Sequence, residues 1–275
     1  MLCETIYLRE AEGDKSVYMN TYVCRREGDM TNPDPRPAIL ILPGGAYFFL
    51  AEREAEPIAK AYLAEGFNAF VLYYSLAENA KFPRPVQDVS LALAYIRRHA
   101  EEWNINPDEV YVTGSSAGGH LAGSIGTFWN RDWAAFDGME KGENKPTAVV
   151  LSYPATSMLE YGHDACRHYV CGEADKDKEE VRRAYSLECQ VTEDTVPHFI
   201  WQTATDDCVD VQNSIILASA LAKAKVPVEL HIFPKGPHGM SVCTKEIESG
   251  NPATVNPHVG HWVKLSVEFM EQIKK

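Results

Sequence analysis

The stretch that decides the fold is Val110-Tyr111-Val112-Thr113-Gly114-Ser115-Ser116-Ala117-Gly118-Gly119-His120. A β-branched, apolar run leads into Gly-x-Ser-x-Gly, and a helix-like run of Ala, Leu and Gly follows. This setting predicts a sharp strand-to-helix turn that lifts the hydroxyl of Ser116 to the end of a strand. Gly114 and Gly118 would keep side chains out of that turn. Taken alone, the same pattern fits an ordinary serine helix cap equally well.

Two later segments place an ionisable side chain just after a strand-like run. Residues 197–203 are typical of a buried strand and lead into a polar turn with Asp206, and residues 228–233 lead into a Gly- and Pro-containing loop with His238. A serine hydroxyl is a weak nucleophile that needs a basic imidazole, which a carboxylate must orient. The chain order Ser, Asp, His, each at a predicted strand end, therefore predicts a catalytic triad of Ser116, Asp206 and His238.

The residues leave alternatives open for two members of this triad. Asp207 lies in the same turn as Asp206 and could be the carboxylate instead. His231 is the rival base, although it lies inside a strand pattern. His120 directly follows the serine motif, and we expect it to be packed or hydrogen-bonded on its helix. Taken singly, each acid or imidazole is better explained as a turn residue or a surface histidine, so the joint pattern carries the hypothesis.

An early loop supplies candidates for oxyanion stabilisation. A predicted strand at residues 38–42 is followed by Pro-Gly-Gly-Ala-Tyr. Acyl transfer needs N–H donors aimed at the oxygen that becomes negatively charged, and paired glycines let the backbone approach a substrate. We assign the donors of an oxyanion hole to Gly45 and Ala46 on this loop and to Ala117 after the serine. Without the serine motif, the loop would be an ordinary Gly-Gly turn.

Strand-like and helix-like runs alternate along the chain. Strands are expected at 4–8, 16–24, 38–42, 68–74, 109–113, 147–153, 197–203 and 228–233, and helices at 52–65, 86–102, after 116, at 211–223 and at 258–273. Alternating β and α units predict an α/β fold with a mostly parallel central sheet and helices on both faces. The site should lie at the carboxyl ends of the strands. We expect a single domain over residues 1–275, with a short cap-like insertion at about 154–195.

The expected cap is short and polar and lacks the broad apolar face of a lipase lid. Its region carries Tyr153, Tyr161, His163, Arg167 and Tyr169. These side chains suit a small, hydroxylated acyl ester, and Tyr47 and Tyr153 are assigned as substrate-binding residues. The equal alternative is that they only pack the cap. The His- and Cys-containing stretch at 163–171 lacks Cys-x-x-Cys or His-x-x-x-His spacing, so no metal site is predicted.

Composition narrows the class of protein. The chain has 275 residues, 45% of them hydrophobic, and a formal net charge of −13. An acidic surface repels phosphate backbones and anionic lipids, which argues against nucleic acid or a membrane as partner. The first residues lack a signal-peptide pattern, and seven scattered cysteines suggest reduced thiols. We therefore expect a cytoplasmic enzyme that could form a homo-oligomer.

Several pieces of the chain carry a resemblance to a known family. They are Leu-Pro-Gly-Gly-Ala-Tyr at 42–47, Phe-Pro-Arg-Pro-Val-Gln-Asp at 82–88, the serine motif at 114–122, Leu-Ser-Tyr-Pro at 151–154, Phe-Ile-Trp-Gln-Thr-Ala at 199–204, Asn-Ser at 213–214 and Phe-Pro-Lys-Gly-Pro-His-Gly at 233–239. Over roughly residues 38–262 the chain resembles bacterial α/β-hydrolases of the acetyl-xylan or carbohydrate acetyl esterase type. These are related to ferulic-acid-esterase-like and hormone-sensitive-lipase-like groups.

The resemblance implies an α/β-hydrolase fold and a serine esterase that needs no metal or organic cofactor. The implied substrates are short-chain acyl esters, typically acetyl groups on sugars or xylo-oligosaccharides. The family's catalytic Asp lies three residues before a valine, which selects Asp206 ahead of Val209. The chain departs from the family at Asp210, where proline is usual, and at Ala46, where a third glycine is usual.

Three other functions compete with this one. A general short-chain carboxylesterase would use the same triad on simpler esters. A prolyl-oligopeptidase-like peptidase shares the layout but usually carries a large additional N-terminal domain, for which this chain has too few residues. A non-catalytic binding protein of the same fold would be expected to lack a triad member, and none is missing.

Overall fold

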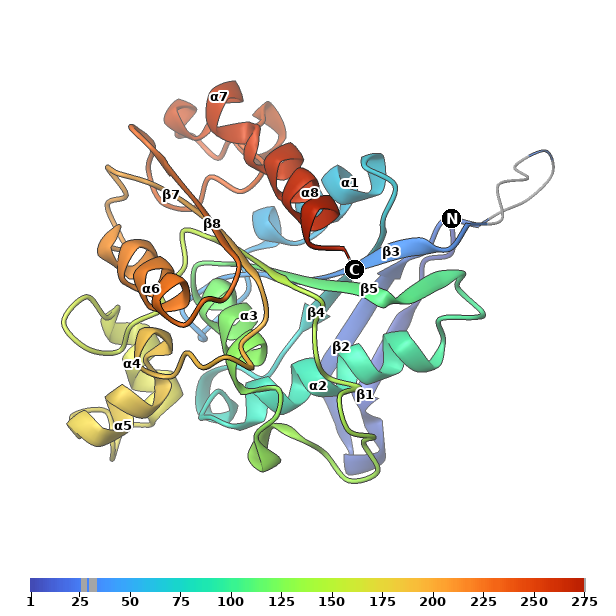
Figure 1. The fold of residues 1–275 in the computed structure, drawn as a ribbon, viewed down its shortest axis with the longest axis horizontal. Coiled ribbons are helices and arrows are strands. Elements are labelled where there is room, and N and C mark those ends of the chain that lie inside the picture. The colour runs from blue at the N-terminus through green and yellow to red at the C-terminus, as the bar shows by residue number, and fades with distance from the viewer. Residues whose placement is uncertain (26–28, 30–33, 275) are drawn as a thin grey trace.

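One eight-stranded sheet organises the computed structural model, which describes residues 1–25, 29 and 34–274. The strand order is β1-β2-β4-β3-β5-β6-β7-β8 (Figure 1). The strands are β1 Thr5–Arg9, β2 Asp14–Tyr22, β3 Arg36–Leu42, β4 Asn68–Tyr73, β5 Ile105–Ser115, β6 Val149–Ser152, β7 His198–Thr203 and β8 Val228–Phe233. Strands β3 to β8 pair in parallel, whereas β1 and β2 form an antiparallel edge. The predicted mostly parallel sheet is therefore confirmed.

Helices cover both faces of this sheet. They are α1 Glu56–Ala64, α2 Arg84–Arg98, α3 Ala117–Phe128, α4 Asp164–Cys171, α5 Glu179–Tyr185, α6 Gln212–Lys223, α7 Pro257–Gly260 and α8 Trp262–Ile273. Helices α1, α7 and α8 lie on one side, and α2, α3 and α6 lie on the other (Figure 1). None of the helices in the described part of the chain is long and apolar enough to cross a bilayer.

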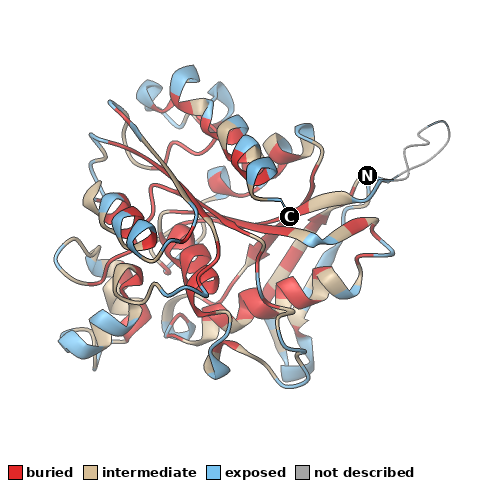
Figure 2. Cartoon of the chain, viewed as in Figure 1, coloured by how far each residue is buried: buried red, intermediate tan, exposed pale blue. Residues whose placement is uncertain are grey.

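Strand β3 shows why both faces must be covered. Ile39 and Ile41 point into the core shared with α1 and α8, whereas Leu40 and Leu42 point into the core shared with α2, α3 and α6. All four side chains are completely buried, as the buried centre of the sheet in Figure 2 shows. A parallel strand that is buried on both faces needs an almost continuous apolar sequence, which residues 38–42 provide.

Element boundaries differ from the predictions where proline and turn chemistry act. The helix expected at 52–65 divides into a short 3₁₀ helix, Glu52–Glu54, and α1, which carries Pro57 in its first turn. The helix expected at 86–102 begins two residues earlier at Arg84, again with a proline in its first turn. Proline fits a first helical turn because no intrahelical hydrogen bond needs its missing N–H there.

The serine turn is as tight as its glycines predict. Ser116 alone separates β5 from α3, and its φ of +54° lies in the left-handed region. A Cβ on Gly114 would lie 2.0 Å from the carbonyl oxygen of Gly118, and a Cβ on Gly118 would lie 2.0 Å from that of Leu42. Side chains at either position would therefore separate α3 from the sheet.

The insertion after β6 contains α4 and α5, beside α6 in Figure 1. Its base is fixed by Asn213 of α6, whose side chain accepts the N–H of Ser157 and donates to the carbonyl of Tyr161. The Arg167 guanidinium donates to the carbonyls of Met158 and Leu159. The Arg167 side chain therefore holds the cap together through hydrogen bonds to its backbone.

Candidate active site

Ser116, His238 and Asp206 meet at the carboxyl ends of β5, β8 and β7. The Nε2 atom of His238 lies 2.9 Å from the Oγ atom of Ser116. On the other side of the ring, Nδ1 lies 2.9 and 3.0 Å from the two carboxylate oxygens of Asp206. An ionised carboxylate can only accept, so Nδ1 carries the proton and Nε2 is free to accept from the serine hydroxyl. This arrangement can draw a proton from Ser116 as its oxygen attacks.

The Asp206 carboxylate is held from several sides. Its side chain is 1% exposed, and Oδ1 accepts the backbone N–H groups of Cys208 and Val209, each at 2.9 Å. Burial acts to raise the pKa of Asp206, but the hydrogen bond and charge of His238, together with these N–H groups, outweigh it and lower the pKa. The carboxylate is therefore ionised at neutral pH.

Asp207 acts on the same loop in a different way. Its Oδ1 accepts the backbone N–H of His238 at 3.1 Å. The two adjacent acids thus contact one histidine at two places, Asp206 at the ring and Asp207 at the main chain. The rival His231 lies on β8, where its Nε2 is 2.7 Å from Oε1 of Glu229.

The loop at residues 43–47, the candidate oxyanion loop, is fixed at its ends and leaves two donors free. The Gly44 N–H donates to Oε2 of Glu54 at 2.8 Å, and the Gly44 carbonyl accepts the Ala51 N–H at 2.9 Å. Among the hydrogen bonds of the described residues, none uses the N–H of Gly45 or of Ala46. Gly45 has a φ of +131°, and a Cβ there would lie 2.0 Å from the carbonyl oxygen of Phe49. This position therefore requires glycine.

The third assigned donor, Ala117, lies across the site from that loop. It is the first residue of α3, where an N–H has no intrahelical acceptor. The two donor groups are close, because a Cβ on Gly44 would lie 2.9 Å from the Cβ of Ser116. Free N–H groups from the loop and from the helix N-terminus thus flank the serine.

Tyr47 and Tyr153, assigned to substrate binding from the sequence, are both buried. The hydroxyl of Tyr47 lies 2.8 Å from Nδ1 of His120, whose Nε2 donates to the carbonyl of Tyr185. Burial lowers the pKa of His120 to about 4, so this ring is neutral, and its predicted packed position is confirmed. The Tyr153 hydroxyl donates to Glu54 at 2.8 Å. A substrate that contacted either hydroxyl would have to displace an internal hydrogen bond.

Sequence reasoning missed two exposed aromatic residues beside the oxyanion loop. Phe48 and Phe49 directly follow the loop, and both side chains are more than half exposed. The Phe48 ring stacks on Tyr169 of α4, with ring centroids 5.8 Å apart, and so joins the loop to the cap. Two consecutive phenylalanines after a Gly-Gly loop fit neither strand alternation nor a helical face, which is the signal that could have revealed them.

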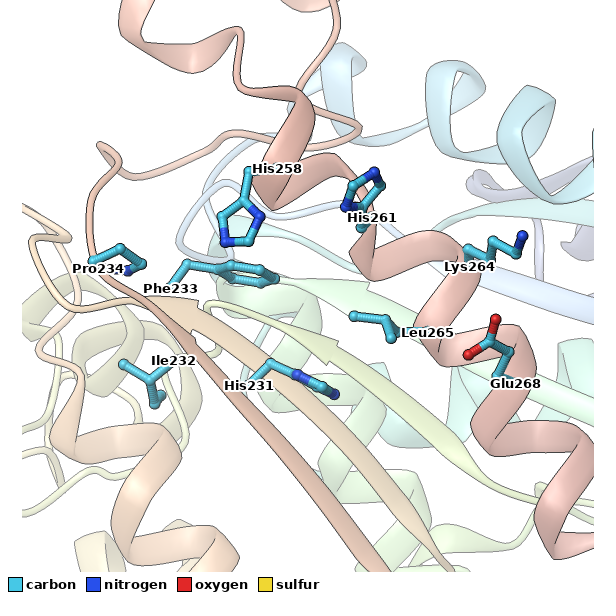
Figure 3. Close-up of a pocket in the computed structure, with 9 residues that line it drawn as sticks. All are labelled: His231, Ile232, Phe233, Pro234, His258, His261, Lys264, Leu265 and Glu268. Carbon is cyan, nitrogen blue, oxygen red and sulfur yellow. The ribbon is translucent and has the colours of Figure 1, made fainter.

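A hollow of about 480 Å³ lies away from the serine, between the end of β8 and helices α7 and α8 (Figure 3). Its wall includes His231, His258, His261, Phe233, Lys264 and Glu268. Ser116, Asp206 and His238 do not line it. Within the described residues, no group of three His, Cys, Asp or Glu side chains has the geometry to hold a metal ion. We assign no reaction to this hollow.

Known proteins share this fold and much of this sequence. The BD-FAE family profile matches residues 29–221. Endo-1,4-beta-xylanase B of Butyrivibrio fibrisolvens is 35% identical over 78% of the chain, and an acetylxylan esterase of Xylanibacter ruminicola is 33% identical over 78%. The chain spans only 34% and 42% of the lengths of these two relatives.

Solved structures match the chain over nearly its full length. The acetyl ester-xyloside bifunctional hydrolase of Caldicellulosiruptor lactoaceticus has a TM-score of 0.82 at 30% identity, covering 98% of this chain and 96% of that one. The fold is that of the α/β hydrolases.

Proposed function

The chain belongs to the BD-FAE family, and from this premise we propose that it is a serine carboxylic ester hydrolase that removes short acyl groups, above all acetyl groups, from sugars or xylo-oligosaccharides. One observation carries the proposal: an unbroken hydrogen-bonded line from the Ser116 hydroxyl through His238 to Asp206. The names of the relatives, an acetylxylan esterase and an acetyl ester-xyloside hydrolase, support the substrate class.

The proposed reaction proceeds through an acyl-enzyme. As the Ser116 oxygen attacks the ester carbonyl, His238 takes the hydroxyl proton at Nε2, and Asp206 stabilises the resulting imidazolium. Collapse of the tetrahedral intermediate expels the sugar alcohol, which takes that proton from His238. Water then attacks the acyl-enzyme, gives its proton to His238, and the acid leaves as Ser116 recovers its hydroxyl hydrogen.

The oxyanion that forms in each half-reaction needs donors that are already in place. The Gly45, Ala46 and Ala117 amides are proposed for this role, because their N–H groups flank the serine without an acceptor of their own. Donors fixed before the reaction lower the barrier, because they need no reorganisation as charge develops.

A general short-chain carboxylesterase is the second candidate, because an apolar surface borders the site. The exposed rings of Phe48 and Phe49 could accommodate an apolar leaving group as well as the face of a sugar.

Substrate comparison with a dead variant tests both candidates. We would measure release of acetate from an acetylated xylo-oligosaccharide and hydrolysis of nitrophenyl acetate, butyrate and octanoate, with Ser116→Ala as control. The sugar esterase is supported by deacetylation of the oligosaccharide, a steep fall beyond butyrate and loss of all activity in the variant. Octanoate cleavage without sugar deacetylation supports the general carboxylesterase. Full activity in Ser116→Ala would contradict the mechanism.

A further inference from the structure

Glu54 is a buried carboxylate outside the triad. It ends the 3₁₀ helix Glu52–Glu54 and is only 2% exposed. No lysine, arginine or histidine among the described residues forms an ion pair with it; its partners are hydrogen-bond donors. Burying a carboxylate costs free energy unless several hydrogen-bond donors compensate it. The donors that contact Glu54 therefore show which parts of the structure it holds in place.

One of its oxygens fixes the oxyanion loop. Oε2 accepts the N–H of Gly44, the residue before the proposed donor Gly45. The fit is close, because a Cβ on Gly44 would lie 2.6 Å from the same oxygen. With its own N–H held by Glu54 and its carbonyl held by Ala51, Gly44 has a fixed peptide orientation on both sides. The direction of the Gly45 N–H follows from that orientation.

The other oxygen reaches the histidine loop through a tyrosine. Oε1 accepts the hydroxyl of Tyr153, and the same hydroxyl accepts the backbone N–H of Ser241 at 3.0 Å. Ser241 lies three residues after His238 and donates its own hydroxyl to the carbonyl of Arg53. The Tyr153 ring packs edge-on against the His238 imidazole, with centroids 4.9 Å apart. The tyrosine therefore contacts both the backbone and the ring side of the histidine loop.

We propose that Glu54 is a positioning residue that fixes the oxyanion loop and the His238 loop relative to each other, acting through Gly44 on one side and Tyr153 on the other. The inference rests on the proposed esterase function for its catalytic consequence. Glu54 touches neither the substrate nor the reacting atoms. It sets the distance between the groups that stabilise the oxyanion and the group that moves the proton.

Leucine, rather than glutamine, removes this link. Both oxygens of Glu54 accept, one from Gly44 and one from Tyr153, whereas a glutamine amide offers one acceptor and one donor. With its oxygen toward the Gly44 N–H, a glutamine could still donate its NH2 group to the Tyr153 hydroxyl, which both donates and accepts. A leucine side chain of similar size offers no acceptor to either loop.

Kinetics and hydrogen–deuterium exchange of the full chain test the proposal. We expect Glu54→Leu to lower kcat about 10- to 100-fold with KM within about 3-fold, since displaced donors weaken the transition state more than the ground state. Amide exchange should rise together in residues 43–47 and 236–243. Tyr153→Phe, which keeps the ring against His238, should lower kcat less and raise exchange mainly in 236–243. Glu52→Leu, exposed on the same 3₁₀ helix, is the matched control.

Each outcome decides a separate question. Wild-type kcat in Glu54→Leu, or faster exchange in only one of the two loops, overturns the proposal. So does a loss of kcat that is fully explained by a smaller folded fraction in thermal unfolding. If the wild-type chain hydrolyses no ester, the proposed function fails by itself, and the exchange of the two loops still decides whether Glu54 couples them.

Discussion

His238 and His231, like His168, each contact a carboxylate, yet these two lie in very different surroundings. His238 and Asp206 are 2.9 Å apart, and His231 and Glu229 are 2.7 Å apart. The Asp206 side chain is 1% exposed and accepts two backbone N–H groups, whereas the Glu229 side chain is 32% exposed and belongs to an edge strand. Only His238 has a hydroxyl, that of Ser116, at its second nitrogen.

The difference shows that a short histidine–carboxylate distance does not by itself make a base. The carboxylate must be buried and held by hydrogen bonds, so that it fixes the tautomer of the imidazole. The second imidazole nitrogen must then face a nucleophile. In a partly exposed pair such as His231 and Glu229, solvent weakens the attraction. Catalysis is therefore expected only where three side chains converge.

Replacing the two histidines in turn is the strongest test of the comparison. His238→Gln should lower kcat about 10⁴-fold or more, because the hydroxyl loses its base. His231→Gln should leave kcat within about 2-fold, because no reacting group contacts it. Steady-state hydrolysis of nitrophenyl acetate measures both. Comparable losses in the two variants would contradict the assignment of the base to His238.

The two adjacent acids, Asp206 and Asp207, should also differ in their effect on kcat. Asp206→Asn should lower kcat about 10³- to 10⁴-fold, because a neutral amide neither fixes the productive tautomer nor stabilises the imidazolium. Asp207→Asn should cost no more than about 10-fold, since an asparagine carbonyl can still accept the His238 N–H. Parallel kcat measurements on the two variants decide the matter. A larger loss in Asp207→Asn would move the catalytic acid by one position.

A third histidine, His198, tests how burial changes the pKa of an imidazole. His198 is completely buried, and burial lowers its pKa from 6.5 to about 4. The unfolded chain binds a proton below pH 6.5, whereas the folded chain binds it only near pH 4. The free energy of unfolding therefore decreases as pH falls from 6.5 toward 4, by about 1.4 kcal/mol per pH unit, because only the unfolded chain binds the proton there. Urea unfolding between pH 6.5 and 4.5 should show a flatter pH dependence in His198→Gln, and parallel curves would refute this.

The smallest effect is expected at the partly exposed pair of His231 and Glu229. Glu229→Gln should change the free energy of unfolding by less than about 1 kcal/mol, because the glutamine amide oxygen can still accept from His231 and partly exposed pairs contribute little. Thermal unfolding at pH 7 measures it. A loss as large as that expected for a buried pair would mean that β8 depends on this contact, and the contrast with Asp206 would not hold.

Local patterns predict much of this molecule. Nearly continuous apolar runs place the central strands, because strands buried on both faces tolerate few polar residues. The serine turn follows from glycines where Cβ atoms would lie 2.0 Å from a carbonyl oxygen. The spacing from Asp206 to Val209 also has a local cause, since the Val209 N–H donates to that carboxylate.

Long-range contacts are what the sequence could not predict. Glu54 and Tyr153 are 99 positions apart, and Tyr153 and Ser241 are 88 apart. Nothing in an acidic run at the start of a helix distinguishes the one glutamate that is buried. The burial of the Tyr47 and Tyr153 side chains could not be predicted from sequence either. Both residues have positive φ values, which the sequence pattern does not reveal and which change where a side chain points.

In the described sheet, strand β8 has a neighbour on one side only; four of its six residues are intermediate in burial and a fifth, Ile232, is exposed. Edge elements of this kind open at a lower free energy than the centre of a sheet. The loop of His238 directly follows β8, so fraying of this strand would move the proposed base away from Ser116 while β3 to β6 stay folded. If the chain is the proposed esterase, ester hydrolysis should therefore cease under mild denaturing conditions before the bulk of the secondary structure melts.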